Sequence, residues 1–219
     1  MKLEVLPTKS YAQAAAALVA AALPEHGTVV LTGGTSAARL YPELAATRPD
    51  WAGIEVFFSD ERCVPPDHEA SNFHLVRSAL LEAVGPATVH RMRGEDDPTA
   101  AAASYDRLVA TAGRFDLVLL SLGADCHVAA LFPWSPALAE QERLCVAVER
   151  PDGLGGLTLT PPALRATRRA MILAQGRVKA AALRRALGAD GELESCPARL
   201  LARIEDLTYI ADAEAARGL

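Results

Sequence analysis

The feature that most constrains the fold is an uninterrupted apolar run in the middle of the chain, residues 117–120. Its sequence, LVLL, has no alternation of polar and apolar side chains, which favours a strand buried on both faces, as in a parallel sheet. The run leads into the loop LGADCHVAALFP, which carries Asp125 and His127. Because open α/β sheets bind ligands at the carboxyl ends of their strands, we expect this loop to lie at a ligand site.

Helical and strand-like segments alternate along most of the chain. The expected helices cover about residues 10–23, 37–46, 71–84, 98–112 and 179–187, with short helices after Pro161 and Pro197 and a fraying helix over 211–219. Expected strands cover residues 28–31, 54–58, 89–92, 145–148, 157–160, 170–174 and 207–210, besides the central strand that starts at Phe115. This order predicts an α/β fold with a mainly parallel sheet, and 219 residues fit a single domain.

Charge and composition argue against several classes of protein. The 22 basic and 27 acidic residues give a net charge of −5, without a block of Lys or Arg that would mark a nucleic-acid or membrane surface. The longest run of small apolar residues, 14–23, is about half of the roughly 20 residues that a membrane-spanning helix needs. An anionic ligand would therefore have to meet local cations or backbone N–H groups.

Cysteine and histidine spacing gives no support for a metal site. The four cysteines are widely separated and form no CxxC pair, so we expect neither a disulfide framework nor a zinc site, and a reducing cytoplasm is the expected location. His68 and His74 lie six residues apart, which matches neither helical metal-ligand spacing nor an HExxH motif.

A glycine-rich turn between an expected strand and an expected helix is a candidate anion cradle. It contains Thr32, Gly33, Gly34, Thr35 and Ser36. Paired glycines let the backbone approach a ligand closely, the hydroxyls can donate, and the following helix presents free N–H groups at its positive end. An ordinary tight turn with a serine N-cap explains the same pattern, because two glycines fall short of a P-loop or a GxGxxG fingerprint.

Ionisable residues also follow two other expected strands. Asp60, Glu61 and Arg62 come directly after residues 54–58, and Lys179 lies in a first helical turn. Three adjacent charges usually form a solvated turn, but a strand end makes a cleft more probable than elsewhere. Arg62 can fork onto an anion or pair with Asp60 or Glu61, while Lys179 either extends to solvent or meets an anion shared with the helix dipole.

Four segments, in order, resemble the 6-phosphogluconolactonase family, within the broader group that includes the glucosamine-6-phosphate deaminases. The first two are LTGGTSAARLYPELA, which is similar to the family's LSGGSTPxxLYxxLA, and FFSDERCVPPDHEASNFHLVRSALL, which is similar to DERxVPxxHxxSN. The other two are LGADCHVAALFP, which resembles LGxGxDGHxASLFP, and GRVKAAALRRAL, which resembles a GxxKA helix start. The resemblance covers nearly the whole chain.

The resemblance implies an open Rossmann-like, mainly parallel sheet with helices on both faces, in one domain over residues 1–219. It also implies hydrolysis of 6-phospho-D-glucono-1,5-lactone to 6-phospho-D-gluconate in the oxidative pentose phosphate pathway, without a metal or nucleotide cofactor. His127 would be the general acid/base, because an imidazole can accept and return a proton at neutral pH. Asp125 would either hold the tautomer of His127 or help to shape the loop.

The remaining site residues follow from the same resemblance. Arg62 would meet substrate oxygens or the charge that develops on the carbonyl. The phosphate would lie on the Gly-rich backbone beside Lys179, so the expected binding residues are Thr32, Gly33, Gly34, Thr35, Asp60 and Lys179. The expected partner is a small-molecule sugar phosphate, with no nucleic acid or membrane, and both a monomer and a homodimer remain open.

Two alternatives remain open on the sequence. A hexosamine-6-phosphate deaminase would use the same fold, but its loop adds a carboxylate where this chain has ALFP, and it carries Tyr where this chain has Arg62. A non-catalytic sugar-phosphate sensor would keep the pocket and lose turnover. The loop and Arg62 favour the lactonase over the deaminase, and the retained Asp125, His127 and Arg62 argue against the sensor.

Three residues depart from the family pattern near the expected site. Cys126 replaces a glycine, which costs on the order of 1 kcal/mol if the position needs a positive φ, and Ser121 replaces another. Gly156 stands where the family carries an arginine expected to bind phosphate. Arg165, or failing that Arg168, is predicted to supply the missing guanidinium.

Overall fold

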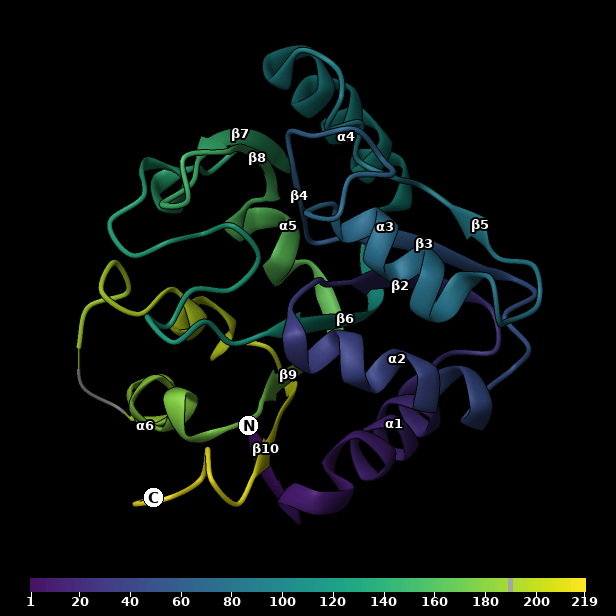
Figure 1. The fold of residues 1–219 in the computed structure, drawn as a ribbon. Coiled ribbons are helices and arrows are strands. Elements are labelled where there is room, and N and C mark those ends of the chain that lie inside the picture. The colour runs from purple at the N-terminus through teal and green to yellow at the C-terminus, as the bar shows by residue number, and fades with distance from the viewer. Residues whose placement is uncertain (189–190) are drawn as a thin grey trace.

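The computed structural model describes residues 1–188 and 191–219 and contains a seven-stranded parallel sheet (Figure 1). The strand order is β1-β10-β9-β6-β2-β3-β5, and every neighbouring pair is parallel. The strands are β1 (Lys2–Leu6), β2 (Gly27–Leu31), β3 (Ile54–Phe58), β5 (Thr88–Val89), β6 (Phe115–Ser121), β9 (Thr167–Ala174) and β10 (Asp206–Asp212). The expected α/β class and the mainly parallel sheet are confirmed.

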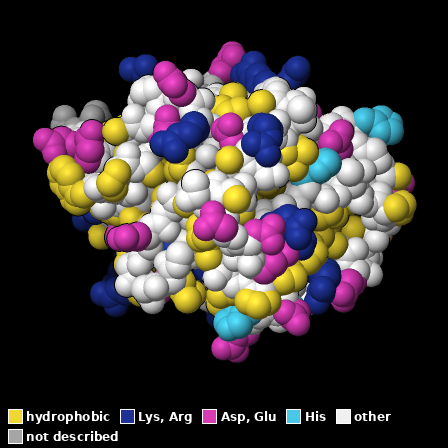
Figure 2. Space-filling view, turned by 90° about the horizontal axis from the view of Figure 1, so that it is seen from above, with side chains coloured by type: hydrophobic (Ala, Val, Ile, Leu, Met, Phe, Trp, Pro, Cys, Tyr) yellow, Lys and Arg dark blue, Asp and Glu magenta, His cyan; other side chains and the backbone are white. Residues whose placement is uncertain are grey.

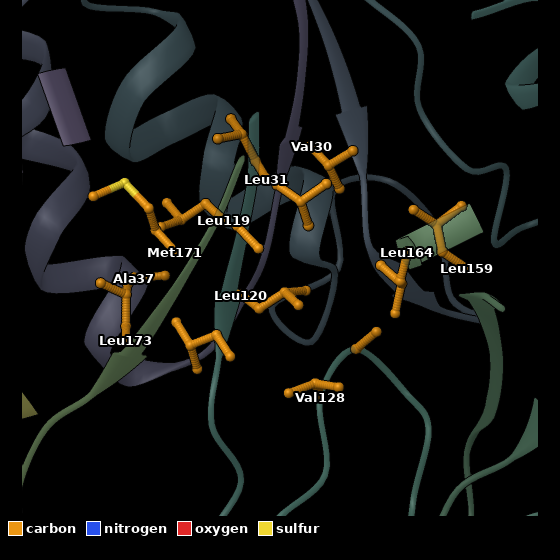
Figure 3. Packing of buried hydrophobic residues seen from close by; sticks show 14 of the residues in the cluster. Val30, Leu31, Ala37, Leu119, Leu120, Val128, Leu159, Leu164, Met171 and Leu173 are labelled. Atoms are coloured by element: carbon orange, nitrogen blue, oxygen red, sulfur yellow. The ribbon is translucent and has the colours of Figure 1, made fainter. Parts of the chain in front are cut away.

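Strand β6 lies at the centre of this sheet, with three strands on each side. All four residues of its apolar run, 117–120, have no exposed surface, as a strand covered on both faces requires. Figure 3 shows Leu119 and Leu120 packed among side chains from other elements, including Val30, Leu31, Met171 and Leu173. The core is therefore built around the segment from which the sequence analysis started.

Helices cover both faces of the sheet. They are α1 (Tyr11–Ala22), α2 (Thr35–Thr47), α3 (Asn72–Val76), α4 (Pro98–Ala112), α5 (Pro161–Arg165) and α6 (Ala180–Leu187). Phe57 of β3 contacts Tyr105 of α4, whereas its neighbour Phe58 contacts Phe73 of α3. Because successive strand residues point to opposite faces, α3 and α4 lie on opposite sides, and α1 and α2 group with α3 (Figure 1).

A second, three-stranded antiparallel sheet packs beside the first. Its order is β4 (Asp60–Arg62), β8 (Gly155–Leu159) and β7 (Cys145–Glu149). The expectation of a charged loop at Asp60 is thus wrong in part, because these residues pair with β8. Leu157 and Leu159 are fully buried in the main core, so the small sheet is an extension of it.

Several shorter elements differ from the expectation. Strand β1 was not foreseen, since its alternating, mostly exposed pattern at the sheet edge contains no buried run. The expected helix over 211–219 is absent from the described structure: β10 continues to Asp212, whose carboxylate accepts from the N–H groups of Gly176 and Ala215 and so holds a turn. The remaining short helices are η1 (Thr8–Ser10), the π-helical η2 (Arg77–Leu81), η3 (Pro136–Ala139), η4 (Arg177–Lys179) and η5 (Pro197–Leu201).

The chain changes direction across the sheet between β2 and β6. From β2 the connections run outward to β3 and β5, whereas from β6 they run the other way to β9 and β10. Loops that leave two such strands diverge above and below the sheet and leave a crevice at their carboxyl ends. The topology therefore places a ligand site where the loops after β2 and β6 meet.

Replacement of Leu119 by alanine should test the importance of the central strand. The cavity left in a fully buried position is expected to lower the free energy of unfolding by about 2–5 kcal/mol, measured by urea denaturation. Leu219→Ala is the matched control, because that side chain is 54% exposed and should change stability by less than about 0.5 kcal/mol. Equal losses in the two variants would contradict the assignment of the core.

Candidate active site

A polar cavity of about 230 Å³ lies at the carboxyl ends of β2 and β6. Its lining comes from the Gly-rich loop after β2, the loop after β6, strand β4, the end of β7 and η4. Three cationic side chains line it, namely Arg62, Arg150 and Lys179. By contrast, the face of the molecule shown in Figure 2 has Lys and Arg side chains interspersed with Asp and Glu. The cavity therefore suits a small anion.

The Gly-rich loop is shaped for close approach of a ligand to the backbone. A Cβ on Gly33 would lie 1.8 Å from Oδ1 of Asn72, and Gly34 has a φ of 94°, so neither position accepts a larger residue without rearrangement. Gly34 precedes α2 without a side-chain cap, which leaves the first N–H groups of that helix available to an anion. Ser36 lies inside α2, and the alternative of a serine N-cap does not hold.

A hydrogen bond joins this loop to β6. The hydroxyl of Ser121 donates to the backbone oxygen of Gly33 at 2.9 Å. Ser121 is one of the departures from the family pattern, and here its side chain fixes the two site loops relative to each other.

The charged segment of β4 is buried rather than solvated. The Glu61 carboxylate, 2% exposed, accepts hydrogen bonds from the N–H groups of Arg62, Asn72 and Phe73 and from the Ser71 hydroxyl. Four donors satisfy this carboxylate, so Glu61 organises the loop that starts α3. Asp60 also lines the cavity and accepts from the Ser59 hydroxyl and the Asn72 amide.

The Arg62 guanidinium keeps its charge available to the cavity. Its Nη1 donates to the backbone oxygen of Ala70 at 2.6 Å, and its buried Nε has no partner within the described residues. Among the described residues, the Arg62 guanidinium forms no ion pair with Asp60 or Glu61. The internal pairing left open by the sequence is therefore not what the structure shows.

Asp125 and His127 are brought together by the loop after β6. Nδ1 of His127 lies 2.6 Å from Oδ1 of Asp125, and the backbone N–H of His127 donates to the same oxygen at 3.2 Å. A Cβ on Gly123 would lie 2.1 Å from Nδ1, so glycine is required for the pair to close. Burial alone would raise the pKa of Asp125, but the hydrogen bonds and charge of His127 outweigh burial and lower that pKa.

The residue between them has the conformation that favours glycine. Cys126 has a φ of 85°, in the left-handed region that glycine occupies most easily. The backbone cost expected for a cysteine in place of the family's glycine therefore applies here. It forms a disulfide with Cys196, with the two Cα atoms 4.9 Å apart. The expectation that the widely spaced cysteines carry no disulfide is thus wrong for this pair, since the fold brings together residues separated by 70 positions.

The loop is anchored again beyond His127. Val128 and Leu131 have no exposed surface, and the N–H of Ala130 donates to Oγ1 of Thr158 in β8. The His127 ring also lies 4.7 Å from the Phe132 ring, centroid to centroid. The imidazole is consequently held from both sides of its own loop.

Lys179 reaches the cavity from η4. Its half-buried ammonium has no carboxylate within ion-pairing distance in residues 1–188 and 191–219. Burial lowers the pKa of Lys179, while the nearby Asp125 carboxylate acts in the opposite direction. The side chain is a desolvated cation that an anionic ligand would stabilise.

The prediction that Arg165 lines the phosphate site is wrong. Arg165 borders a different cavity and its Nε donates to the backbone oxygen of Leu200. Arg168 is no better placed, because it pairs with Asp116 at the amino-terminal end of the sheet. The physical reason is that α5 carries the chain back to the start of β9, which is parallel to β6, so both arginines lie away from the strand ends that form the site.

Among the cavity residues that sequence reasoning did not assign to the site are Asn72 and Arg150. Asn72 donates to Asp60 and faces Gly33, and its SN motif was the available signal. Arg150 lines the cavity from the end of β7, next to a turn that carries no recognisable motif.

In the described part of the chain, no three His, Cys, Asp or Glu side chains gather as metal ligands. No described helix combines the length and apolarity needed to span a membrane.

Replacing Cys196 by serine should reveal what the disulfide contributes. Loss of a bond that closes a loop of this length is expected to lower the free energy of unfolding by about 2–4 kcal/mol, measured by urea denaturation without a reductant. Cys63→Ser makes the same chemical change at a cysteine outside the disulfide and should have a smaller effect. Wild-type stability that is unchanged by dithiothreitol would contradict the expected contribution.

Known proteins resemble this chain in both sequence and fold. A family model described as glucosamine-6-phosphate isomerases/6-phosphogluconolactonase matches residues 6–209. A 6-phosphogluconolactonase from Synechocystis is 36% identical over an alignment of 205 residues, and the match covers 89% of this chain and 85% of that protein. A 6-phosphogluconolactonase from Streptomyces coelicolor is 35% identical, over 86% of this chain and 81% of that protein.

Solved structures agree with the sequence comparison. A 6-phosphogluconolactonase from Shewanella baltica has a TM-score of 0.88 at 27% identity, covering 97% of this chain and 98% of that one. A monomeric glucosamine-6-phosphate deaminase has a TM-score of 0.85 at 21% identity, over 99% of both chains, which shows a shared fold alone. The chain therefore belongs to the glucosamine-6-phosphate isomerase/6-phosphogluconolactonase family.

Proposed function

We propose that this protein hydrolyses 6-phospho-D-glucono-1,5-lactone to 6-phospho-D-gluconate, a step of the oxidative pentose phosphate pathway. The names of its relatives support this reaction. The observation that carries the proposal is the contact of Asp125 with His127, whose side chain lines a cavity that also holds three cations; Asp125 itself supports the imidazole from outside the cavity lining. An acid/base pair beside an anion site is what hydrolysis of a phosphorylated lactone requires.

His127 transfers the proton in this proposal. Asp125, kept ionised by its lowered pKa, accepts the hydrogen on Nδ1 and leaves Nε2 as the base. Nε2 takes a proton from a water molecule, whose oxygen bonds to the lactone carbonyl carbon. The tetrahedral intermediate then breaks its bond to the ring oxygen, which receives the proton from His127 and becomes the product hydroxyl.

The cations and the Gly-rich loop bind and polarise the substrate. Arg62 stabilises the negative charge that develops on the carbonyl oxygen, and Asp60 lines the cavity beside it. The phosphate lies on the backbone of Thr32, Gly33, Gly34 and Thr35, at the start of α2, with Lys179 against it. The reaction adds water across an ester without oxidation and therefore needs no redox cofactor; the proposal includes no metal or nucleotide cofactor.

The proposal also includes the domain organisation, the binding partner and the location of the protein. We propose one domain over residues 1–219, supported by a core cluster that includes side chains from both sheets. The partner is a small-molecule sugar phosphate, with no nucleic acid or membrane partner. The proposed location is the cytoplasm.

His127→Ala should test the catalytic assignment. Loss of the general acid/base is expected to lower kcat by about 10²–10⁴-fold, measured as lactone hydrolysis at neutral pH and corrected for spontaneous opening. His26→Ala, at an exposed histidine away from the cavity, should leave kcat unchanged. Equal rates for wild type and His127→Ala would refute the assignment. Tight binding of 6-phosphogluconate by a wild type without turnover would indicate a sensor instead.

Lys179→Met should separate ligand binding from stability. Removing the cation is expected to raise KM by about 10- to 100-fold, because a charge-assisted hydrogen bond to phosphate is lost. The pKa of Lys179 is lowered in the folded state, so a protonated Lys179 destabilises the fold at any pH below the pKa of an unfolded lysine. Replacing Lys179 by methionine should therefore not lower the free energy of unfolding at neutral pH. A loss of stability with an unchanged KM would contradict the proposed role.

A further inference from the structure

Gly156 has no backbone reason to be glycine. It lies inside β8, opposite Val148 of β7 and Arg62 of β4, and its φ is outside the left-handed region. Glycine within a strand is destabilising and often marks the close approach of another group. The reason for this glycine must therefore lie in the space above it.

That space is filled by the side chain of Arg150. A Cβ on Gly156 would lie 2.9 Å from Cδ and 3.1 Å from Cγ of Arg150, closer than packed side chains allow. The side chain of Arg150 is only 8% exposed, and its guanidinium lies 5.5 Å from the centre of the Phe132 ring. Phe132 in turn contacts the His127 ring. The arginine thus crosses Gly156 to reach the catalytic end of the cavity.

The hydrogen bonds of Arg150 leave one edge of the guanidinium available. Nε and Nη2 donate to the carboxylate of Asp152, which is 47% exposed, at 2.8–3.2 Å. Nη1 is 3.8 Å from Oδ2 of Asp60 and has no hydrogen bond within the described residues. Asp60 itself accepts from Ser59 and Asn72, so it does not depend on Arg150 for its partners.

We propose that Arg150 binds the phosphate group of the substrate and that Gly156 is the residue that admits it. This inference rests on the proposed function. A guanidinium suits a phosphate because its fork can contact two oxygens at once. The family pattern has an arginine at position 156; here a guanidinium reaches the cavity from position 150, directly after the strand that faces Gly156. Arg150, Lys179 and the start of α2 then surround one anion.

The first test measures phosphate binding directly. Inorganic phosphate is used as a competitive inhibitor of lactone hydrolysis and as a ligand in calorimetry. Arg150→Ala is expected to weaken phosphate binding and raise the KM for the lactone, each by about 10- to 100-fold, with kcat changed far less. Arg150→Lys, which keeps the charge but loses the fork, should recover part of the loss. Arg143→Ala is the control, because that exposed side chain pairs with Glu140 outside the cavity.

The second test uses the contact between the two residues. Gly156→Ala is expected to displace Arg150 and to weaken phosphate binding at least several-fold, but to have no further effect when Arg150 is already alanine. Equal effects of Gly156→Ala in both backgrounds would overturn the role given to Gly156. Thermal unfolding of each variant separates these effects from a loss of fold.

Other outcomes distinguish this inference from the proposed function. Lactone hydrolysis by the wild type, with phosphate binding unaffected by Arg150→Ala, would overturn the inference alone. A raised KM with unchanged phosphate binding would assign Arg150 to the sugar and would also overturn it. A wild type without hydrolysis would refute the proposed function, while calorimetry with phosphate would still decide the role of Arg150.

Discussion

Parallel strands end on the same edge of a sheet, and the site depends on this constraint. The loops after β2 and β6 meet because their strands are neighbours whose onward connections diverge. The hydrogen bond from Ser121 to Gly33 then fixes the anion-binding loop relative to the loop that carries His127. Strand β4 adds Arg62 directly after β3, and η4 adds Lys179 after β9. Residues far apart in the sequence therefore lie in one crevice, because each of them follows a strand that ends there.

Charge is distributed to suit an anion inside a protein of net charge −5. The Glu61 carboxylate is fully used by four donors, so it shapes the site without opposing a ligand. Arg62 and Lys179 have no carboxylate partner in the described residues, and Lys179 is partly desolvated. Such cations cost stability in the empty protein, and an anionic substrate would relieve that cost. Stability is thus given up where binding needs it.

The parts that could be predicted from the sequence are those with strong local signals. Strand β3 and helix α4 were foreseen at their observed bounds, because an apolar run and an Asp-Pro helix start are unambiguous. The loop that carries Asp125 and His127 was located from the apolar run before it, and their pairing was expected from the family resemblance. Strand β4 was not foreseen, since three charged residues usually form a turn and only pairing with β8 buries them. Pairings across the fold leave no local trace, which is why the sequence pointed to Arg165 and Arg168 and why both Arg150 and the Cys126–Cys196 disulfide were missed.

The disulfide also couples the effects of substitutions at two distant positions, 126 and 196. At position 126 a side chain in a positive φ costs on the order of 1 kcal/mol, and the gain of about 2–4 kcal/mol expected from the bond to Cys196 would offset it. A change at position 196 alone would leave the cost without the gain, beside the histidine proposed to do the chemistry. A return to glycine at 126 alone would leave a buried thiol without its partner. The contributions of the two cysteines to stability are therefore coupled, although the chain separates them by 70 positions.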